Sequence, residues 1–297
     1  MIPITTLAVT LEAQHPIDLG AIPGASLRGA LYEALAVMYD TGAQPRSRHD
    51  VDTNPVGWLL RLEDETTGGK DVPRPIAIRP PLQNSQSVLT FGVSFYGRGH
   101  ECIPMVLSAL SAMQTIGVGR GRNRVKVKEI AHVDPFTRQH KEIKQDLPQP
   151  VSAAAYQQFA TMLAKDSLSV RFLTPTRIIQ QDRLCHEPIF RVWFQRLLER
   201  IRKISESYAE PVHIPFTDLL PLAEAVIIES DQTRWQEGWS HSRMEGMRRP
   251  MGGFVGEVMY RGDFTLLHPY LLVGQSLQVG KNTVKGSGWY DMQYRWM

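Results

Sequence analysis

Residues 117–128 form the first segment of the chain whose residue types could do chemistry. It carries five cations at alternate positions: Arg120, Arg122, Arg124, Lys126 and Lys128. Alternate side chains of an extended strand share one face, so these cations would repeat about every 6.5–7 Å, close to the spacing of phosphates along a nucleic-acid strand. The pattern predicts contact with nucleic acid. A charged edge strand that resists aggregation has the same pattern, and the sequence leaves that alternative open.

A second glycine-rich segment, residues 274–288, carries Lys281 and Lys285. Glycine lets backbone N–H groups approach a phosphate closely, and the two lysines add positive charge. The segment does not fit the P-loop of nucleotide-binding proteins, because Lys281 is followed by Asn282 rather than by serine or threonine. The pattern therefore indicates an anion-binding loop, and its place before a final strand mirrors that of residues 117–122.

The third segment, residues 243–249, sets three arginines against one acid, Glu245. These arginines are Arg243, Arg248 and Arg249. Trp235, Trp239 and His241 precede them. Cations interleaved with aromatic rings suit RNA, because its backbone attracts the cations and its bases stack on the rings. A solvated surface loop is the alternative.

Residue types that bind metals are present but not arranged as ligands. The nine histidines include no HExxH motif and no cluster with ligand spacing. Cys102 and Cys185 lie too far apart in sequence to form a disulfide framework or a zinc finger. We therefore expect neither a metal nor a cofactor.

The N-terminal half must position the first basic segment. Its apolar spacing predicts a strand, a helix, two strands, a helix and a strand. These elements cover residues 2–11, 26–38, 76–78, 88–96, 103–116 and 125–130. The order is that of the ferredoxin-like, RNA-recognition-type fold.

A second cycle of elements follows a polar stretch, residues 134–150, that ends in Leu-Pro-Gln-Pro. The predicted strands cover 168–172, 254–260 and 289–296, and the predicted helices cover 189–208 and 270–277, with a glycine-rich loop at 280–288. We therefore expect an α+β chain of two tandem ferredoxin-like domains, residues 1–150 and 151–297.

The composition of the 297 residues is that of a globular protein. Hydrophobic residues make up 42% and charged residues 21%, which excludes a disordered or collagen-like chain. The formal charge of +3 permits a nucleic-acid partner without requiring one. The most apolar stretch, residues 219–228, is too short to cross a bilayer, and the N-terminus has no secretory pattern, so we expect a cytoplasmic protein.

Four segments, taken in order, resemble one protein family. They read IPGASLRGAL at 22–31, FLTPTR at 172–177, GGFVGEV at 252–258 and VGKNTVKGSG at 279–288. Together they resemble the repeat-processing endoribonucleases of the RAMP superfamily, the Cas6 family, which cut CRISPR precursor RNA. The resemblance covers nearly the whole chain.

The resemblance implies tandem ferredoxin-like domains and metal-independent cleavage of each repeat. In that chemistry a general base deprotonates the attacking 2′-OH, and the products carry a 2′,3′-cyclic phosphate and a 5′-hydroxyl. The guide RNA typically stays bound in this family. The implied partners are therefore CRISPR repeat RNA, the mature guide RNA and other subunits of a CRISPR effector complex.

The resemblance also points to catalytic candidates, with one departure from the family. Relatives often carry a histidine just before the Val-Gly-Lys of the last loop, where this chain has Gln278. Family catalytic residues often lie in or just after the first helix, which points here to Tyr32 and His49; His241 is the second histidine candidate. We expect Arg28 and the cations of the three segments (Arg120, Arg122, Arg124, Arg243, Arg248, Arg249, Lys281 and Lys285) to bind RNA.

Two other classes of function compete with an endonuclease. A guide-RNA-binding subunit that does not cut is the alternative if no histidine acts as the base. An unrelated protein with tandem RNA-recognition domains has less support, because the sequence contains no aromatic strand of the type those domains use to stack bases.

Overall fold

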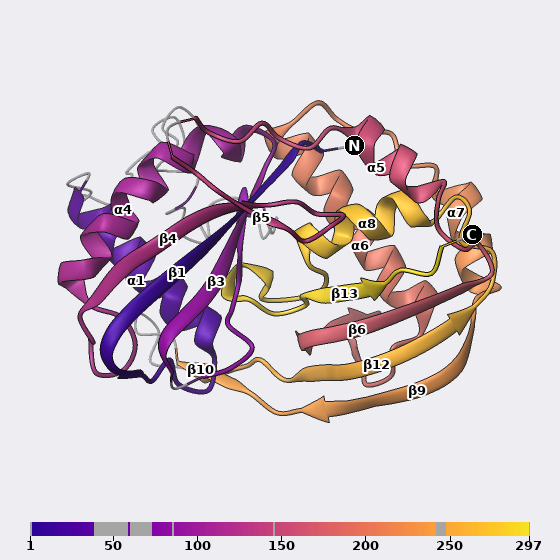
Figure 1. Cartoon of the computed structure of the whole chain (residues 1–297). Coiled ribbons are helices and arrows are strands. Elements are labelled where there is room, and N and C mark those ends of the chain that lie inside the picture. Colours follow the sequence, from indigo (N-terminus) through magenta and orange to yellow (C-terminus); the bar gives the residue numbers. More distant parts are fainter. Residues whose placement is uncertain are drawn as a thin grey trace.

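The N-terminal half builds a five-stranded antiparallel sheet with the order β2-β3-β1-β4-β5. The computed structural model describes residues 2–38, 59, 73–84, 86–144, 146–241 and 248–296. The strands are β1 (Ile4–Ile17), β2 (Ile76–Arg79), β3 (Gln86–Tyr96), β4 (Val125–Val133) and β5 (His140–Glu142). Helices α1 (Pro23–Met38) and α4 (Ile103–Ile116) lie on one side of these strands (Figure 1).

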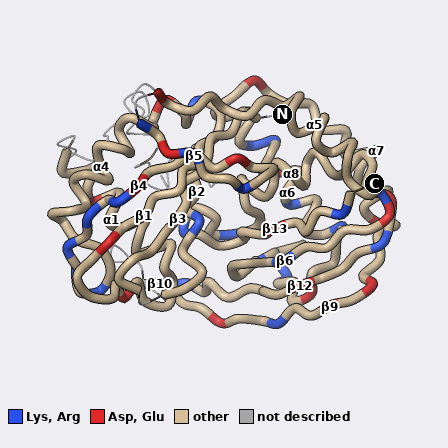
Figure 2. The backbone as a smooth tube through the Cα atoms, viewed as in Figure 1, with Lys and Arg blue, Asp and Glu red and all other residues tan. Residues whose placement is uncertain are grey.

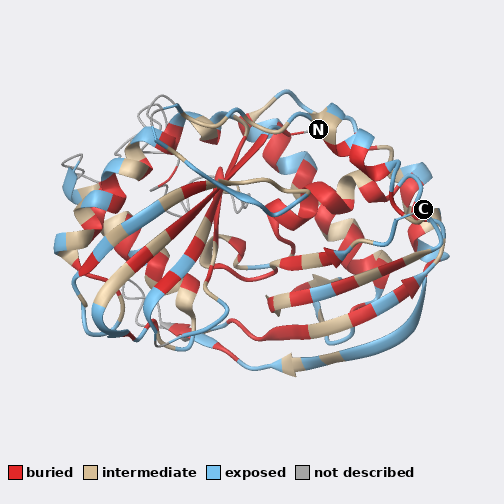
Figure 3. Cartoon of the chain, viewed as in Figure 1, coloured by how far each residue is buried: buried red, intermediate tan, exposed pale blue. Residues whose placement is uncertain are grey.

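Apolar periodicity explains these elements. Leu7, Val9 and Leu11 alternate along β1, are fully buried, and belong to the same core as Leu27 of α1 and Leu110 of α4. Figure 3 shows the buried residues on the faces where helices and strands meet. The predicted bounds of α4 are confirmed. Helix α1 begins three residues earlier than predicted, at Pro23, because proline is well suited to the first turn of a helix.

The C-terminal half builds a four-stranded antiparallel sheet with the order β13-β6-β12-β9. Its strands are β6 (Ser167–Thr176), β9 (Ile227–Gln236), β12 (Gly253–Arg261) and β13 (Tyr290–Gln293). Helices α6 (Phe190–Tyr208) and α8 (His268–Leu277) cover the face that buries Val170, Phe172 and Tyr290.

The two sheets have one topology. Without β5, and with strands numbered along each half, both sheets have the strand order fourth, first, third, second. In each half one main helix follows the first strand and another follows the third. This is the ferredoxin-like arrangement. The predicted α+β fold with two tandem ferredoxin-like units is confirmed.

Strand β9 is the main element that the sequence analysis missed. It is the second strand of the C-terminal unit and an edge strand, and most of its residues are exposed. Between Glu229 and Thr233 it carries only polar side chains, so it has no apolar alternation to detect. Also missed were β5, which lies within the polar stretch 134–150, and the short elements α5 (Ala153–Ala160), α7 (Phe216–Glu224), β7 (Ile178–Gln180), β8 (Arg183–Cys185), β10 (Trp239–His241) and β11 (Arg248–Pro250).

The turn between β4 and β5 ties the two halves together. Arg138 donates from Nη1 to Asp291 Oδ2 at 2.6 Å and from Nη2 to the carbonyl oxygen of Met292 at 2.7 Å. Burial raises the pKa of Asp291, and the Arg138 guanidinium opposes that shift. Among the described residues, no helix is long and apolar enough to span a membrane.

Candidate nucleic-acid interface and active site

The N-terminal turn of α1 touches the loop between α8 and β13 (residues 278–289, the α8–β13 loop). A Cβ atom built on Gly24 of α1 would lie 2.3 Å from the backbone oxygen of Lys285. Gly286 follows with φ of +91°, a left-handed conformation that favours glycine, and packs against Pro80. Two of the family-like segments, one from each half, therefore meet in direct contact.

The hairpin of β10 and β11 begins beside Ile22, the residue before α1. A Cβ atom built on Gly238, the residue before β10, would lie 3.2 Å from Cδ1 of Ile22. In the hairpin Ser240 pairs with Arg249, and His241 pairs with Arg248. The structure thus brings the start of the hairpin that contains Arg248 and Arg249 close to the entry of α1. The proposed residues Arg243 and His49 lie outside the described residues.

Backbone amides of the α8–β13 loop are used within the protein. The N–H of Lys281 donates to the carbonyl oxygen of Arg177 at 3.0 Å, and the N–H of Lys285 donates to that of Asn282 at 2.9 Å. The expectation that the loop offers its backbone donors to a phosphate is therefore wrong at these two positions.

Arg28 and Tyr32 lie one turn apart on α1. The Arg28 guanidinium carbon stands 4.4 Å from the centre of the Tyr32 ring. Arg28 Nε and Tyr32 Oη are both buried, and neither finds a hydrogen-bond partner among the described residues. Buried polar atoms usually have partners, because losing water without replacing its hydrogen bonds is costly. The pair therefore has unused hydrogen-bonding capacity on the helix whose first turn meets the loop.

The turn between α4 and β4 (residues 117–124, the α4–β4 turn) corrects the predicted stripe of cations. Arg120 and Arg122 lie in this turn, and Arg122 has φ of +46°, so neither belongs to an extended strand. Strand β4 begins only at Val125 and contains Lys126 and Lys128. The alternation was real in sequence, but the glycines that interrupt it form a turn rather than a strand.

Acids of the same half pair with most of these cations. Arg120 Nη1 lies 3.8 Å from Asp18 Oδ2, and Arg122 Nη1 lies 2.8 Å from Glu33 Oε1. Lys128 pairs with Glu12 at 3.7 Å. Arg124 is exposed and makes no ion pair within the described part of the chain. Figure 2 shows the wider pattern, with cations and acids interspersed over both halves.

Two further groups near the hairpin were not singled out for chemistry by sequence. Arg177, which follows β6, donates from Nη1 to the carbonyl oxygen of Gly252 at 3.3 Å, between the hairpin and the α8–β13 loop. The exposed ring of His186 lies 4.4 Å from that of Trp235, whose Nε1 donates to Glu237. His186 lies outside the family-like segments, and only the fold brings it near the hairpin.

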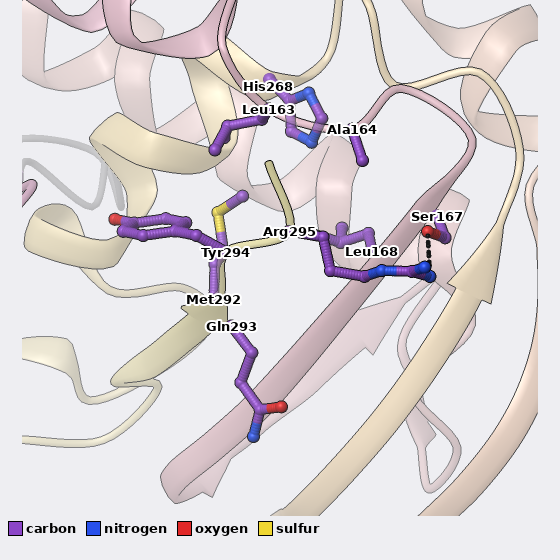
Figure 4. A pocket seen from close by; sticks show the side chains of 9 residues that line it. All are labelled: Leu163, Ala164, Ser167, Leu168, His268, Met292, Gln293, Tyr294 and Arg295. Carbon is purple, nitrogen blue, oxygen red and sulfur yellow. Dashed lines mark hydrogen bonds between the residues drawn. The ribbon is translucent and has the colours of Figure 1, made fainter. Parts of the chain in front are cut away.

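Three other described histidines are partly or fully buried, namely His100, His132 and His268. Burial lowers the pKa of His100 and His132, and it lowers that of His268 to about 4. His268 lines a cavity of about 10 Å³ beside Tyr294 and Arg295, near the C-terminus (Figure 4). A cavity of that size holds roughly one water. Within the described residues no three His, Cys, Asp or Glu side chains could hold a metal ion.

Known families match both halves of the chain. Residues 2–155 match the family AF_1859_N, described as an N-terminal domain, and residues 170–290 match the CRISPR-associated endoribonuclease Cas6 family. No curated protein sequence matches the chain.

Solved structures match the fold over almost the full length. A Thermus thermophilus Cas6 in a product complex has a TM-score of 0.66 at 14% identity, covering 98% of this chain and 99% of that one. A second Cas6 product complex has a TM-score of 0.58 at 17% identity, covering 99% and 100%. A chain of a partial Cas6-RT-Cas1–Cas2 complex has a TM-score of 0.64 at 12% identity, covering 99% of this chain and 46% of that one. The chain therefore belongs to the family AF_1859_N by residues 2–155, residues 170–290 match the CRISPR-associated endoribonuclease Cas6 family, and the whole chain has the fold of solved Cas6 structures.

Proposed function

We propose that this protein binds CRISPR precursor RNA and cuts it within the repeats. The observation that carries the proposal is the contact of Gly24 with Lys285, which sets the first helix of one half against the lysine-bearing loop of the other. A phosphodiester at this junction would face cations from two directions. The match of residues 170–290 to the Cas6 family supports the substrate class, and similar structures were solved as product and substrate-mimic complexes.

The proposed reaction needs acid–base catalysis and no metal. A general base takes the 2′-OH proton, O2′ attacks phosphorus, the P–O5′ bond breaks, and a proton passes to the leaving O5′. The products are a 2′,3′-cyclic phosphate and a 5′-hydroxyl. Cations stabilise the charge that develops on the phosphoryl oxygens.

We assign His49 as the general base, with His241 as the second candidate. An ordinary imidazole titrates near pH ~6.5 and accepts a proton at neutral pH. Tyr32 Oη, which is unpaired among the described residues, is the proposed donor of a hydrogen bond or proton at the phosphate. In the same scheme Arg28, Lys281 and Lys285 bind the scissile region.

The remaining proposed contacts position the RNA along its backbone, since phosphate contacts carry little base information. They come from the hairpin segment (Arg243, Arg248 and Arg249) and from the α4–β4 turn (Arg120, Arg122 and Arg124). We further propose that the guide RNA stays bound within a CRISPR effector complex in the cytoplasm. We also propose that the two units are domains divided at residue 150.

Cleavage of end-labelled repeat RNA in EDTA tests the reaction. The expected result is cutting at one position, with a cyclic phosphate on the upstream product. A 2′-deoxy substitution at the cut site is the matched control and should abolish cutting. Dependence on Mg²⁺ or a 3′-hydroxyl product would overturn the mechanism. Binding without cutting on any cognate repeat would favour the guide-RNA-binding subunit.

A further inference from the structure

The end of β2 holds the end of α8 and the loop that follows it. Gln278, the first residue after α8, donates from Nε2 to the carbonyl oxygen of Ile78 at 2.8 Å. Arg79 donates from Nη2 to the carbonyl oxygen of Gln275 at 3.1 Å and to Ser276 Oγ at 3.0 Å. The next residue, Pro80, packs against Gly286. Ile78, Arg79 and Pro80 therefore all contact the end of α8 or the α8–β13 loop.

Other donors cap the carbonyl end of α8. Tyr96 Oη donates to the carbonyl oxygen of Ser276 at 3.0 Å, and Arg200 Nε donates to that of Leu277 at 2.9 Å. The last carbonyls of a helix lack partners within the helix, and its C-terminus attracts cations. With these caps in place, the end of α8 has a defined position relative to β2 and β3.

Gln278 is an unfavourable residue for its position. Its φ is +63°, a left-handed conformation that side chains other than glycine rarely adopt. It is fully buried, and its Oε1 has no hydrogen-bond partner among the described residues. At the corresponding end of α4 the chain has Gly117, with φ of +84°. A glycine would end α8 with less strain, so a side chain at residue 278 needs another reason.

We propose that Gln278, supported by Arg79, is a positioning residue for cleavage. It holds the α8–β13 loop of the C-terminal half against α1 of the N-terminal half. Its amide reaches the carbonyl of Ile78, and the loop it anchors continues directly to Lys281 and Lys285. Gln278 touches no reacting atom and acts through the loop. This inference rests on the proposed function, because its effect on rate requires that the loop face the scissile phosphate.

Hydrogen exchange and single-turnover cleavage together test this role. Gln278→Met keeps the volume of the side chain and removes its amide, whereas Gln278→Gly removes the amide and also relieves the left-handed strain. In both variants we expect faster exchange of the Lys281 and Lys285 amides without RNA. At saturating RNA the cleavage rate should fall roughly 10–100-fold, as for a small misplacement of catalytic groups, with Kd changed less than about threefold.

Two controls separate positioning from stability. Gln293→Met changes an exposed glutamine of β13 and should leave exchange and rate unchanged. The pH profile of the rate should keep its shape in every variant, because Gln278 does not titrate. A glycine variant with a normal melting temperature but a slow cleavage rate would support positioning over general destabilisation.

The proposal is overturned if both Gln278 variants exchange like the wild type. It is also overturned if exchange rises while the rate at saturating RNA stays normal, or if rate and affinity fall together. If the wild-type protein never cuts repeat RNA, the proposed function itself is wrong, and Gln278 then has no role in cleavage. The exchange experiment then still reports whether the loop is seated by this residue.

Discussion

The α4–β4 turn and the α8–β13 loop hold the same topological place in the two halves and differ in what they touch. Each follows the second main helix of its ferredoxin-like unit, precedes the fourth strand and carries glycine with cations. The α4–β4 turn folds back on its own half, where Asp18 and Glu33 pair with Arg120 and Arg122. The α8–β13 loop crosses to the other half and meets Gly24.

This difference teaches that composition and topology alone do not determine how strongly a basic loop can attract a phosphate. The residues beside the loop determine this attraction, because an acid next to an arginine offsets the positive charge that a phosphate would otherwise meet. A contact between halves, by contrast, can build a site that neither half contains alone. Two repeated units in one chain can thus share a fold while their equivalent loops make different contacts.

The largest expected effect concerns which half supplies the general base. His49→Ala should lower the cleavage rate roughly 10²–10⁴-fold while RNA affinity is kept, because general-base catalysis contributes about that much. Single-turnover rates at saturating repeat RNA measure the loss.

His241→Ala is the comparison from the C-terminal half and should cut at a near-normal rate. A strongly reduced cleavage rate for the His241 variant, together with a normal rate for the His49 variant, would identify His241 of the hairpin as the general base. Normal rates for both variants would leave a catalyst without histidine, for which Tyr32 and Lys281 are the candidates.

The contact between halves can be broken at one position of α1. Gly24→Ala places a Cβ atom 2.3 Å from the Lys285 oxygen, so helix and loop must separate. We expect the cleavage rate to fall roughly 100-fold, as for displaced catalytic groups. Gly29→Ala is the matched control on the same helix, because its added Cβ meets nothing within 4 Å. Equal rates for the two variants would contradict a site built from this contact.

A third comparison sets the buried His268 of the C-terminal half against the exposed His140 of the N-terminal half. The pKa of His268 is lowered to about 4 by burial, so the unfolded chain binds a proton more readily than the folded chain between about pH 6.5 and pH 4. Stability due to this group is therefore present above pH ~6.5 and is lost as the pH falls. From pH 7.5 to pH 5 the loss should be about 2 kcal/mol.

Urea unfolding at the two pH values measures this contribution. His268→Leu should remove about 2 kcal/mol of the pH dependence, and His140→Leu should leave it in place. An unchanged pH dependence in the His268 variant would show that its imidazole titrates normally in the folded protein.

Local patterns predicted the ferredoxin-like units because apolar periodicity was strong where the cores are. Helix α4 kept its predicted bounds, since each of its turns buries apolar residues. Strand β9 escaped detection because a polar edge strand carries no such signal. The stripe through Arg120 and Arg122 failed for a different reason: glycine in the segment favoured a turn over a strand.

The site was harder to predict than the fold because it depends on contacts between distant segments. Sequence patterns single out the segments containing Gly24 and Lys285, but the contact between them joins residues far apart in the chain. Gln278 departs from the residue that relatives often carry, and only the structure reveals its hydrogen bond to the carbonyl oxygen of Ile78. Nothing in the local sequence of Asp18 or Glu33 indicates that these acids pair with arginines of the α4–β4 turn.

The smallest expected effect compares the two basic loops directly. Replacing Lys281 and Lys285 together with alanine should weaken RNA binding about tenfold and lower the slope of log affinity against log salt by about 1.5, because roughly 0.7–0.9 counterions are released for each phosphate contact. Replacing Arg120 and Arg122 together should change that slope by less than half as much, since Asp18 and Glu33 already offset their charge. Asp18→Asn with Glu33→Gln sharpens the test: it should raise affinity and steepen the slope by releasing the two arginines. Equal slopes for the lysine and arginine variants would mean that both loops face RNA alike, and the neighbours would then not distinguish them.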